Sequence, residues 1–239
     1  MQTNKKLLFI PGGPWISGEY WDSFIENNFS SIPCERIVLM NHEHRYSSQR
    51  TPTFDEMLND LKTQIVTQNS TVSLIGHSYG AFLILLLLDQ LIIDKVDKII
   101  LTCMPFSTNR TKAVTDFVNS KEKINIQNNE DFTRYFNSIL NLYFHFTSSA
   151  KKNKWITKGS YKEGNENLLI NDDLVCKCIE NLKIFEKDVS FIFADNDLII
   201  GDSWKDCLRD QPKIIKGSGH FPMLEQPELF SNILNSVLK

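Results

Sequence analysis

Short apolar runs alternate along the chain with longer segments in which apolar residues recur every three or four positions. Short apolar runs bounded by turn residues indicate buried strands, and the longer spacing indicates amphipathic helices. The strand-like runs are residues 7–10, 36–40, 72–75, 99–103, 189–193 and 213–215, and the helix-like segments are 19–29, 53–69, 81–91, 131–144, 173–185 and 228–238. Strands that are apolar throughout need cover on both faces, so the pattern predicts an α/β fold: a mostly parallel six-stranded sheet with helices on both faces.

One stretch, residues 107–187, breaks this alternation between the fourth and fifth strands. It is polar, rich in Asn and Lys, and punctuated by aromatic residues. We expect a helical lid insertion there, with residues 1–106 and 188–239 forming the core. Thr53 and Glu56 have the spacing of a capping box, which predicts the start of a helix. Pro227 suits the first turn of the last helix.

Composition narrows the classes of partner. The chain has 239 residues, 41% of them hydrophobic, and a net charge of −3, so nothing favours binding to nucleic acid or to an anionic membrane. The longest apolar run, residues 81–88, is far shorter than the ~20 residues of a membrane span. The run at residues 7–10 is likewise too short for the core of a signal peptide. Five cysteines without metal spacing indicate reduced thiols in a cytoplasmic protein.

Two further segments have a bland and a sharper interpretation. His42, Glu43 and His44 stand side by side, but not in a metal-binding spacing, and we predict no metal and no cofactor. Residues 151–162 combine lysines with aromatic residues. We interpret them as a solvated surface of the insertion, with docking of an anionic group as the alternative.

The most informative motif is the pentapeptide Gly76-His77-Ser78-Tyr79-Gly80, which lies between a predicted strand and a predicted helix. In a G-x-S-x-G turn of this kind a serine is held exposed on a strained backbone. The glycines let the strand and the helix approach closely. Ser78 is therefore the candidate nucleophile, and an ordinary serine in a Gly-flanked turn is the alternative.

A nucleophilic serine needs a base, and the base needs an orienting acid. His220 follows the sixth strand in a glycine-containing loop and is the candidate base, whereas His77, next to Ser78 on an extended segment, should point to the opposite face. Asp197 follows the fifth strand and is the preferred acid, with Asp195 as the reserve. Both aspartates could also cap the local turn.

A tetrahedral intermediate needs amide donors for its oxyanion. The amide of Tyr79, directly after the nucleophile, is one candidate. The other should follow the first strand, where Gly13 is preferred over Trp15 and Pro14 has no N–H to offer. Trp15, Tyr20 and Trp21 could line an acyl pocket or simply bury the first helix.

With its glycine-rich turn, serine elbow, insertion, aspartate loop and histidine loop, nearly the whole chain resembles the α/β-hydrolase superfamily. The order Ser, Asp, His is that of the family. The resemblance implies a lidded serine hydrolase of the esterase or proline-iminopeptidase-like branch, with strands in the spatial order 2-1-3-4-5-6. It departs from the family at Pro11, where His is common, and in the loop after the second strand, which usually carries Arg and Gly.

These observations predict a serine hydrolase that cleaves a small carboxylic ester, thioester or amide through an acyl-enzyme intermediate. Carboxylesterase activity is favoured over aminopeptidase activity, because Ala81 stands where proline-releasing enzymes usually carry a further glycine. Two alternatives stay open: a ligand-binding member of the fold without turnover, and an acyltransferase. The partner is a small-molecule substrate, and the sequence does not define the oligomeric state.

Overall fold

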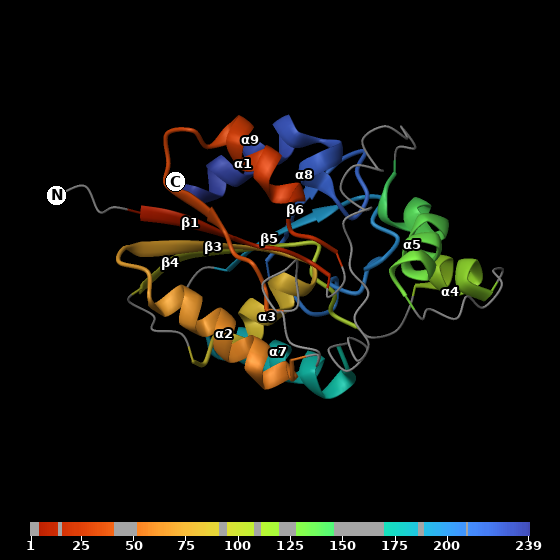
Figure 1. The fold of residues 1–239 in the computed structure, drawn as a ribbon, viewed down its shortest axis with the longest axis horizontal. Helices are drawn as coiled ribbons and strands as arrows, with labels where there is room; N and C mark the ends of the chain where they lie inside the picture. Colours follow the sequence, from red (N-terminus) through yellow and green to blue (C-terminus); the bar gives the residue numbers. More distant parts are fainter. Residues whose placement is uncertain are drawn as a thin grey trace.

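The structure is a computed structural model that describes residues 5–13, 16–40, 52–90, 95–107, 111–119, 128–145, 170–185, 189–208 and 210–239. In these ranges six strands form one sheet in the order β2-β1-β3-β4-β5-β6, and every pairing is parallel (Figure 1). The strands are β1 (Lys5–Ile10), β2 (Cys34–Arg36), β3 (Thr71–His77), β4 (Val96–Thr102), β5 (Val189–Ala194) and β6 (Lys213–Ile215). The α/β prediction and the strand order implied by the family resemblance are both confirmed.

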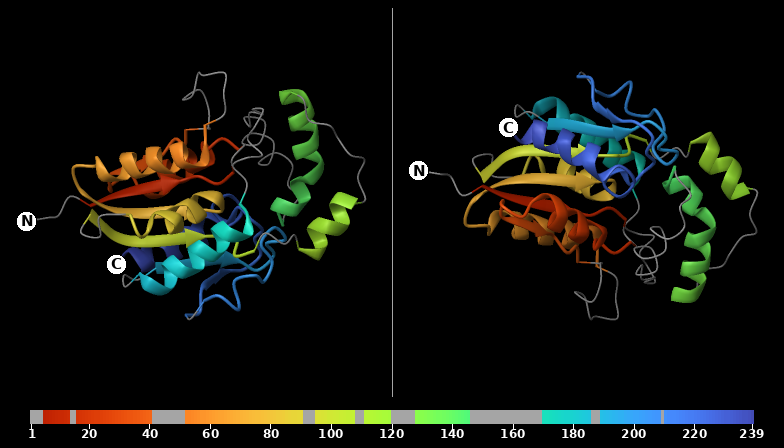
Figure 2. Two further views of the ribbon diagram at one scale, coloured as in Figure 1. Left: turned by 90° about the horizontal axis from the view of Figure 1, so that it is seen from below. Right: turned by 90° about the horizontal axis from the view of Figure 1, so that it is seen from above.

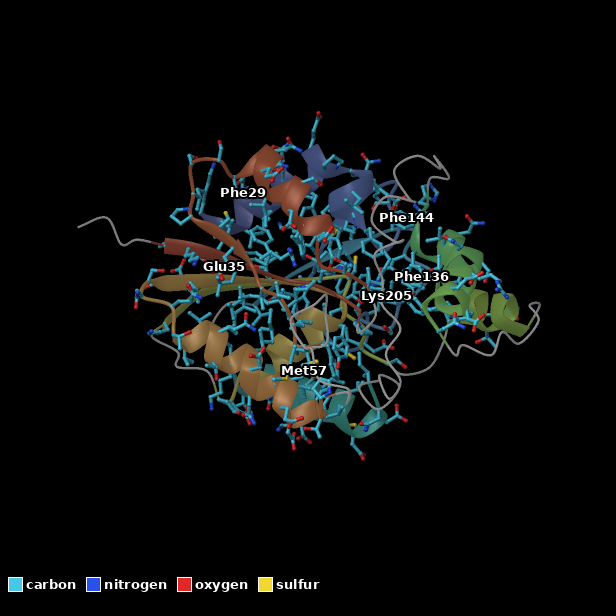
Figure 3. All side chains as sticks on the ribbon, in the orientation of Figure 1. Phe29, Glu35, Met57, Phe136, Phe144 and Lys205 are labelled. Carbon is cyan, nitrogen blue, oxygen red and sulfur yellow. The ribbon has the colours of Figure 1, made fainter. Side chains whose placement is uncertain are left out.

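Helices cover both faces of the sheet, because successive residues of each strand point to opposite sides. In β1, Leu8 and Ile10 join one apolar cluster, while Leu7 and Phe9 join the other. One face is covered by α2 (Phe54–Val66), α3 (Tyr79–Leu87) and α7 (Asp172–Ile184), and the other by α1 (Tyr20–Asn28), α8 (Pro222–Glu225) and α9 (Pro227–Leu238). Figure 3 labels Met57 of α2 and Phe29 on the two sides of the sheet.

The sequence signals for α2 and α3 work as predicted. Thr53 Oγ1 accepts the Glu56 amide at 3.2 Å and the Glu56 carboxylate accepts the Thr53 amide at 2.8 Å, so the capping box is confirmed. All nine residues of α3 are buried, as expected for a helix that is apolar on every side. Within the described ranges no helix is long and apolar enough to cross a membrane.

The second strand lies earlier than predicted. β2 pairs through Cys34–Arg36, two residues ahead of the expected apolar run at 36–40. Ile37 and Leu39 of that run are buried, and the Ile37 amide still donates to Phe9 at 2.9 Å. An apolar pattern indicates which residues are buried, whereas a strand is defined by hydrogen bonds to its neighbour. Here the buried apolar residues follow the residues that pair.

The helices of the predicted insertion separate into two groups. α4 (Lys112–Asn119) and α5 (Asn129–Tyr143) lie beyond the carboxyl ends of the strands (Figure 2), and apolar residues of α5 join the cluster on the α1 and α9 face. α7, in contrast, packs on α3, where the Asn181 amide group donates to the Leu85 carbonyl at 2.9 Å. The sequence placed α7 in a lid; its contacts instead make it part of the layer that covers the sheet.

Candidate active site

Ser78 lies at the turn between β3 and α3. Its φ of 50° and ψ of −116° belong to a strained region that non-glycine residues rarely adopt. Its amide donates to the Thr102 carbonyl at 2.8 Å, which ties the turn to the end of β4. Ser78 is partly exposed although its neighbours in the turn are buried. The turn therefore presents the hydroxyl at the carboxyl edge of the sheet, where open α/β sheets bind ligands.

The two glycines of the motif are required by close packing. A Cβ on Gly76 would lie 2.6 Å from Ala81 Cα, and a Cβ on Gly80 would lie 2.6 Å from the Ile10 carbonyl oxygen. Both contacts are with backbone atoms, which cannot rotate away. The glycines thus allow α3 to start directly beside β1 and β3.

His220 lies in the loop between β6 and α8. Its amide donates to the Tyr143 carbonyl at 2.7 Å, at the end of α5. The Glu225 carboxylate accepts the amides of Gly219 and His145, both at 2.7 Å. Hydrogen bonds to the Tyr143 carbonyl and to the Glu225 carboxylate therefore hold the backbone of the loop that carries His220, independently of the contacts of its imidazole.

Ser78, His220 and Asp197 form one hydrogen-bonded row. His220 Nδ1–H donates to Asp197 Oδ2 at 2.8 Å, because a carboxylate only accepts. This leaves His220 Nε2 as the acceptor for the Ser78 hydroxyl at 2.9 Å. Asp197 Oδ1 accepts the Ile199 and Ile200 amides at 3.0 and 3.2 Å. The carboxylate is fixed by these bonds, and the imidazole is held in the tautomer that can take a proton from Ser78.

Asp195, the reserve acid, has a different position. It is exposed, and its Oδ1 accepts the Gly217 amide at 2.8 Å. It therefore braces the turn before the histidine loop and does not contact the imidazole. The structure brings Asp197 to His220 and leaves Asp195 to cap the turn.

Cys103 directly follows β4 and lies beside Asp197 and His220, at the buried end of the row. Cys103 has a φ of 47°. Among the described residues, Cys103 and Ser78 are the non-glycine residues with a positive φ. Burial, and after it the Asp197 carboxylate, raises the pKa of the Cys103 thiol well above its usual value. The thiol therefore stays protonated beside the acid.

The same side chains are the group in the described chain that could hold a metal. One ligand atom each from Cys103, Asp197 and His220 lies within 4.8 Å of the others. Two ligands on a tetrahedral zinc, each ~2.1 Å from the ion, would lie ~3.4 Å apart. The 2.8 Å between His220 Nδ1 and Asp197 Oδ2 is a hydrogen-bond length, so the arrangement fits a shared proton better than an ion. His42 and His44 lie outside the described residues.

Two of the three predicted pocket residues, Tyr20 and Trp21, lie in the core. Tyr20 is 1% exposed and Trp21 is fully buried, so neither ring presents surface to a substrate and the pocket prediction does not hold for them. Both rings bury α1 against the sheet, the alternative that the sequence also allowed. Trp15 lies outside the described residues. A hollow of about 450 Å³ near Lys98 and Lys213 lies at the amino ends of the strands, away from Ser78.

Gly13 and Tyr79, the predicted oxyanion donors, follow β1 and β3 at the same edge as Ser78. Gly13 has a φ of 96°, which only glycine adopts without strain. The neighbouring Gly12 amide is already donated to the Tyr20 hydroxyl at 2.7 Å. Tyr79 opens α3 and so lies at the positive end of the helix dipole.

Sequence reasoning missed the contacts that hold these loops together. From the sequence no role was assigned to Glu225, which accepts two amides of these loops, or to Cys103, which lies beside Asp197. The hydroxyl of Tyr20 and the ring of His77 meet across 57 positions of sequence, and no local pattern signals such a contact. The available signal was general: a tyrosine hydroxyl that is buried usually has a hydrogen-bond partner.

A parallel sheet in this order, with a serine on the turn after β3, defines the α/β-hydrolase fold. Residues 7–154 match a family model described as serine hydrolase, and the chain belongs to that family. The protein is thus a hydrolase by family. No curated protein sequence matches the chain.

Solved structures show the same architecture. A putative aryl esterase from Burkholderia cenocepacia has 15% identity and a TM-score of 0.73, over 98% of this chain and 89% of its own. MenH from S. aureus has 15% identity and a TM-score of 0.72, over 100% and 94%. A lipase-esterase related protein from Clostridium acetobutylicum has 19% identity and a TM-score of 0.66, over 99% and 95%. At these identities the likeness shows the fold alone.

Proposed function

We propose that the protein is a serine hydrolase that cleaves a small carboxylic ester, thioester or amide through an acyl-enzyme intermediate. The observation that carries this proposal is the row of hydrogen bonds from Ser78 through His220 to Asp197. A partly exposed hydroxyl that donates to a buried, oriented imidazole is the arrangement that activates serine.

In the first half of the reaction, Ser78 Oγ attacks the substrate carbonyl carbon while its proton passes to His220 Nε2. The amides of Gly13 and Tyr79 stabilise the oxyanion that forms. As the tetrahedral intermediate collapses, the bond to the leaving group breaks, and His220 returns the proton to that group. The products are a free alcohol, thiol or amine and an acyl ester on Ser78.

In the second half, water attacks the acyl carbonyl and gives a proton to His220 Nε2. The second tetrahedral intermediate releases the carboxylic acid, and the proton returns to Ser78 Oγ. Asp197 stays ionised throughout and stabilises the imidazolium while it exists. No metal or cofactor enters these steps.

The part of the insertion that carries α4 and α5 is the proposed source of substrate selectivity. The ring of Tyr143, at the end of α5, lies 5.5 Å from the ring of His220, so the insertion reaches the reacting atoms. Figure 3 labels Phe136 and Phe144 in the same region. Two of the structural neighbours are a putative aryl esterase and a lipase-esterase related protein, which supports ester substrates as the first to be tested.

Labelling with a fluorophosphonate tests this function. The wild-type protein should be labelled covalently, and Ser78→Ala should abolish labelling. Ser236→Ala, which removes an exposed serine of α9, should label at the wild-type rate. Turnover of p-nitrophenyl esters of graded chain length, beside proline and alanine anilides, then identifies the acyl group. Labelling that persists in Ser78→Ala would remove Ser78 from its role.

A further inference from the structure

A second buried hydrogen-bond chain runs behind the Ser78 row and has no part in the chemistry above. The Tyr20 hydroxyl accepts the Gly12 amide at 2.7 Å and lies 2.7 Å from His77 Nδ1. On its other side, His77 Nε2 lies 2.7 Å from the carbonyl oxygen of His220. Tyr20, His77 and His220 are at most 2% exposed, so water does not take part in these contacts.

The two ends of this hydrogen-bond chain fix its outer bonds, and the buried surroundings of His77 decide the middle one. The Gly12 amide can only donate, so the Tyr20 oxygen accepts from it and turns its own proton toward His77 Nδ1. The His220 carbonyl can only accept, so His77 Nε2 carries a proton. When the Tyr20 hydroxyl donates to Nδ1, His77 is neutral, with Nδ1 as acceptor and Nε2–H as donor. Its enclosure favours the same state, because burial and then the neighbouring His220 lower the pKa of His77 well below its ordinary value.

These hydrogen bonds connect the three loops that hold the proposed reacting groups. Gly12 precedes the proposed oxyanion donor Gly13, His77 precedes Ser78, and the carbonyl belongs to His220 itself. A Cβ on Gly12 would lie 3.0 Å from both His77 Nδ1 and Ser78 Cβ, so the first loop packs directly on the second. A shift in any of the three loops would have to break a buried bond and leave a buried polar group unpaired, which is unfavourable.

We propose that Tyr20 and His77 are positioning residues, which hold the oxyanion loop, the serine turn and the histidine loop in one register through the bonds from Gly12 to the His220 carbonyl. This inference rests on the proposed function. His77 does not contact Ser78 Oγ in the row and exchanges no proton with substrate. Its task is to fix where the backbone of His220 lies, and with it the distance from Nε2 to the serine hydroxyl.

The test compares variants that keep the polarity of the chain with variants that remove it. His77→Gln places a carbonyl oxygen toward Tyr20 and an N–H toward His220, as the imidazole does, whereas His77→Leu offers neither. Tyr20→Phe removes the hydroxyl alone. We expect the second-order rate of fluorophosphonate labelling to fall ~10–100-fold in His77→Leu and Tyr20→Phe, by analogy with other supporting shells. In His77→Gln it should stay within about fivefold of wild type. On the best p-nitrophenyl ester the loss should appear in kcat, with KM little changed.

The matched control is Phe24→Leu, on the same helix as Tyr20. Phe24 is 3% exposed and packs on Phe9 and Phe230 without touching the hydrogen-bond chain. This variant weakens the packing of α1, and per folded molecule it should label at the wild-type rate. If Phe24→Leu loses as much labelling as Tyr20→Phe at equal folded fraction, the role of Tyr20 is structural support alone and the inference is overturned.

A second measurement does not depend on activity. In ¹⁵N NMR of the wild-type imidazoles, His77 should show a protonated Nε2 and an unprotonated Nδ1; the opposite tautomer would contradict the assignment. Failure of the two proposals is distinguishable. If wild-type labelling is absent or survives Ser78→Ala, the proposed function fails. If labelling requires Ser78 but His77→Leu reacts as fast as wild type, the function stands and the positioning role is wrong.

Discussion

Replacing Asp197 by Asn is the sharpest test of the proposed base, because the side chain keeps its size and loses one acceptor. Oδ1 of Asp197 accepts two backbone amides at 3.0 and 3.2 Å, and Oδ2 accepts Nδ1–H of His220 at 2.8 Å. In Asp197→Asn the amide oxygen keeps the two backbone donors, since an NH₂ group cannot accept them. The NH₂ group is then turned toward His220 Nδ1.

Two N–H donors cannot bond to one another, so His220 has to take the other tautomer. Its proton then lies on Nε2, facing Ser78, and no lone pair is left to receive the serine proton. Where a neutral amide replaces the acid of such a row, kcat falls by ~10⁴, equivalent to ~5.4 kcal/mol of transition-state stabilisation. We expect a loss of this size, with folding little affected.

The assay is fluorophosphonate labelling together with hydrolysis of p-nitrophenyl acetate, and Asp195→Asn is the control. Asp195 is exposed and accepts the Gly217 amide through Oδ1, a bond that an amide oxygen can keep. This variant should stay within about threefold of wild type, as is usual for surface changes. Equal losses in the two variants, or no loss in Asp197→Asn, would refute the assignment of Asp197.

Two predictions concern stability. The pKa of His77 is lowered by burial, so as pH falls below ~6.5 the unfolded chain takes up the proton first and stability decreases. Between pH 7 and pH 5 urea titrations should show the wild type losing more stability than His77→Gln, by up to ~2 kcal/mol, and parallel losses would contradict a buried neutral imidazole. Gly80→Ala places a methyl group 2.6 Å from the Ile10 carbonyl oxygen. It should cost at least ~1–3 kcal/mol in the same titrations, and an unchanged midpoint would show that the contact can relax.

The sheet could be predicted from sequence because two independent signals mark its strands. Each strand except β2 contains an apolar run, and turn residues and helical spacing separate it from the next. The row of Ser78, Asp197 and His220 was predictable for a related reason: parallel strands bring their following loops to one edge, so order along the chain suffices to gather them. The choice between Asp195 and Asp197 needed coordinates, since both lie in the same loop.

The remaining differences between prediction and structure arise where an apolar pattern predicts that a residue is buried but not which element it packs against. Ile37 and Leu39 are as apolar as strand residues, yet they lie beyond the ladder. α7 follows a polar stretch in the sequence, and only its contact with α3 shows that it covers the sheet. Tyr20 and Trp21 were candidates for a pocket because they are aromatic and close to Gly13 in sequence, but helical direction turns them into the core.

The bond from the His220 amide to the Tyr143 carbonyl joins the end of α5 to the histidine loop, and it would limit the motion of this segment if the segment acts as the expected lid. A flap that swung out as one body would carry the end of α5 with it, strip the histidine loop of its backbone partner, and release His145 from Glu225. Admission of substrate by this route would switch the enzyme off at the moment of entry. A lid motion that preserves the base would have to leave the last turn of α5 beside His220 in place.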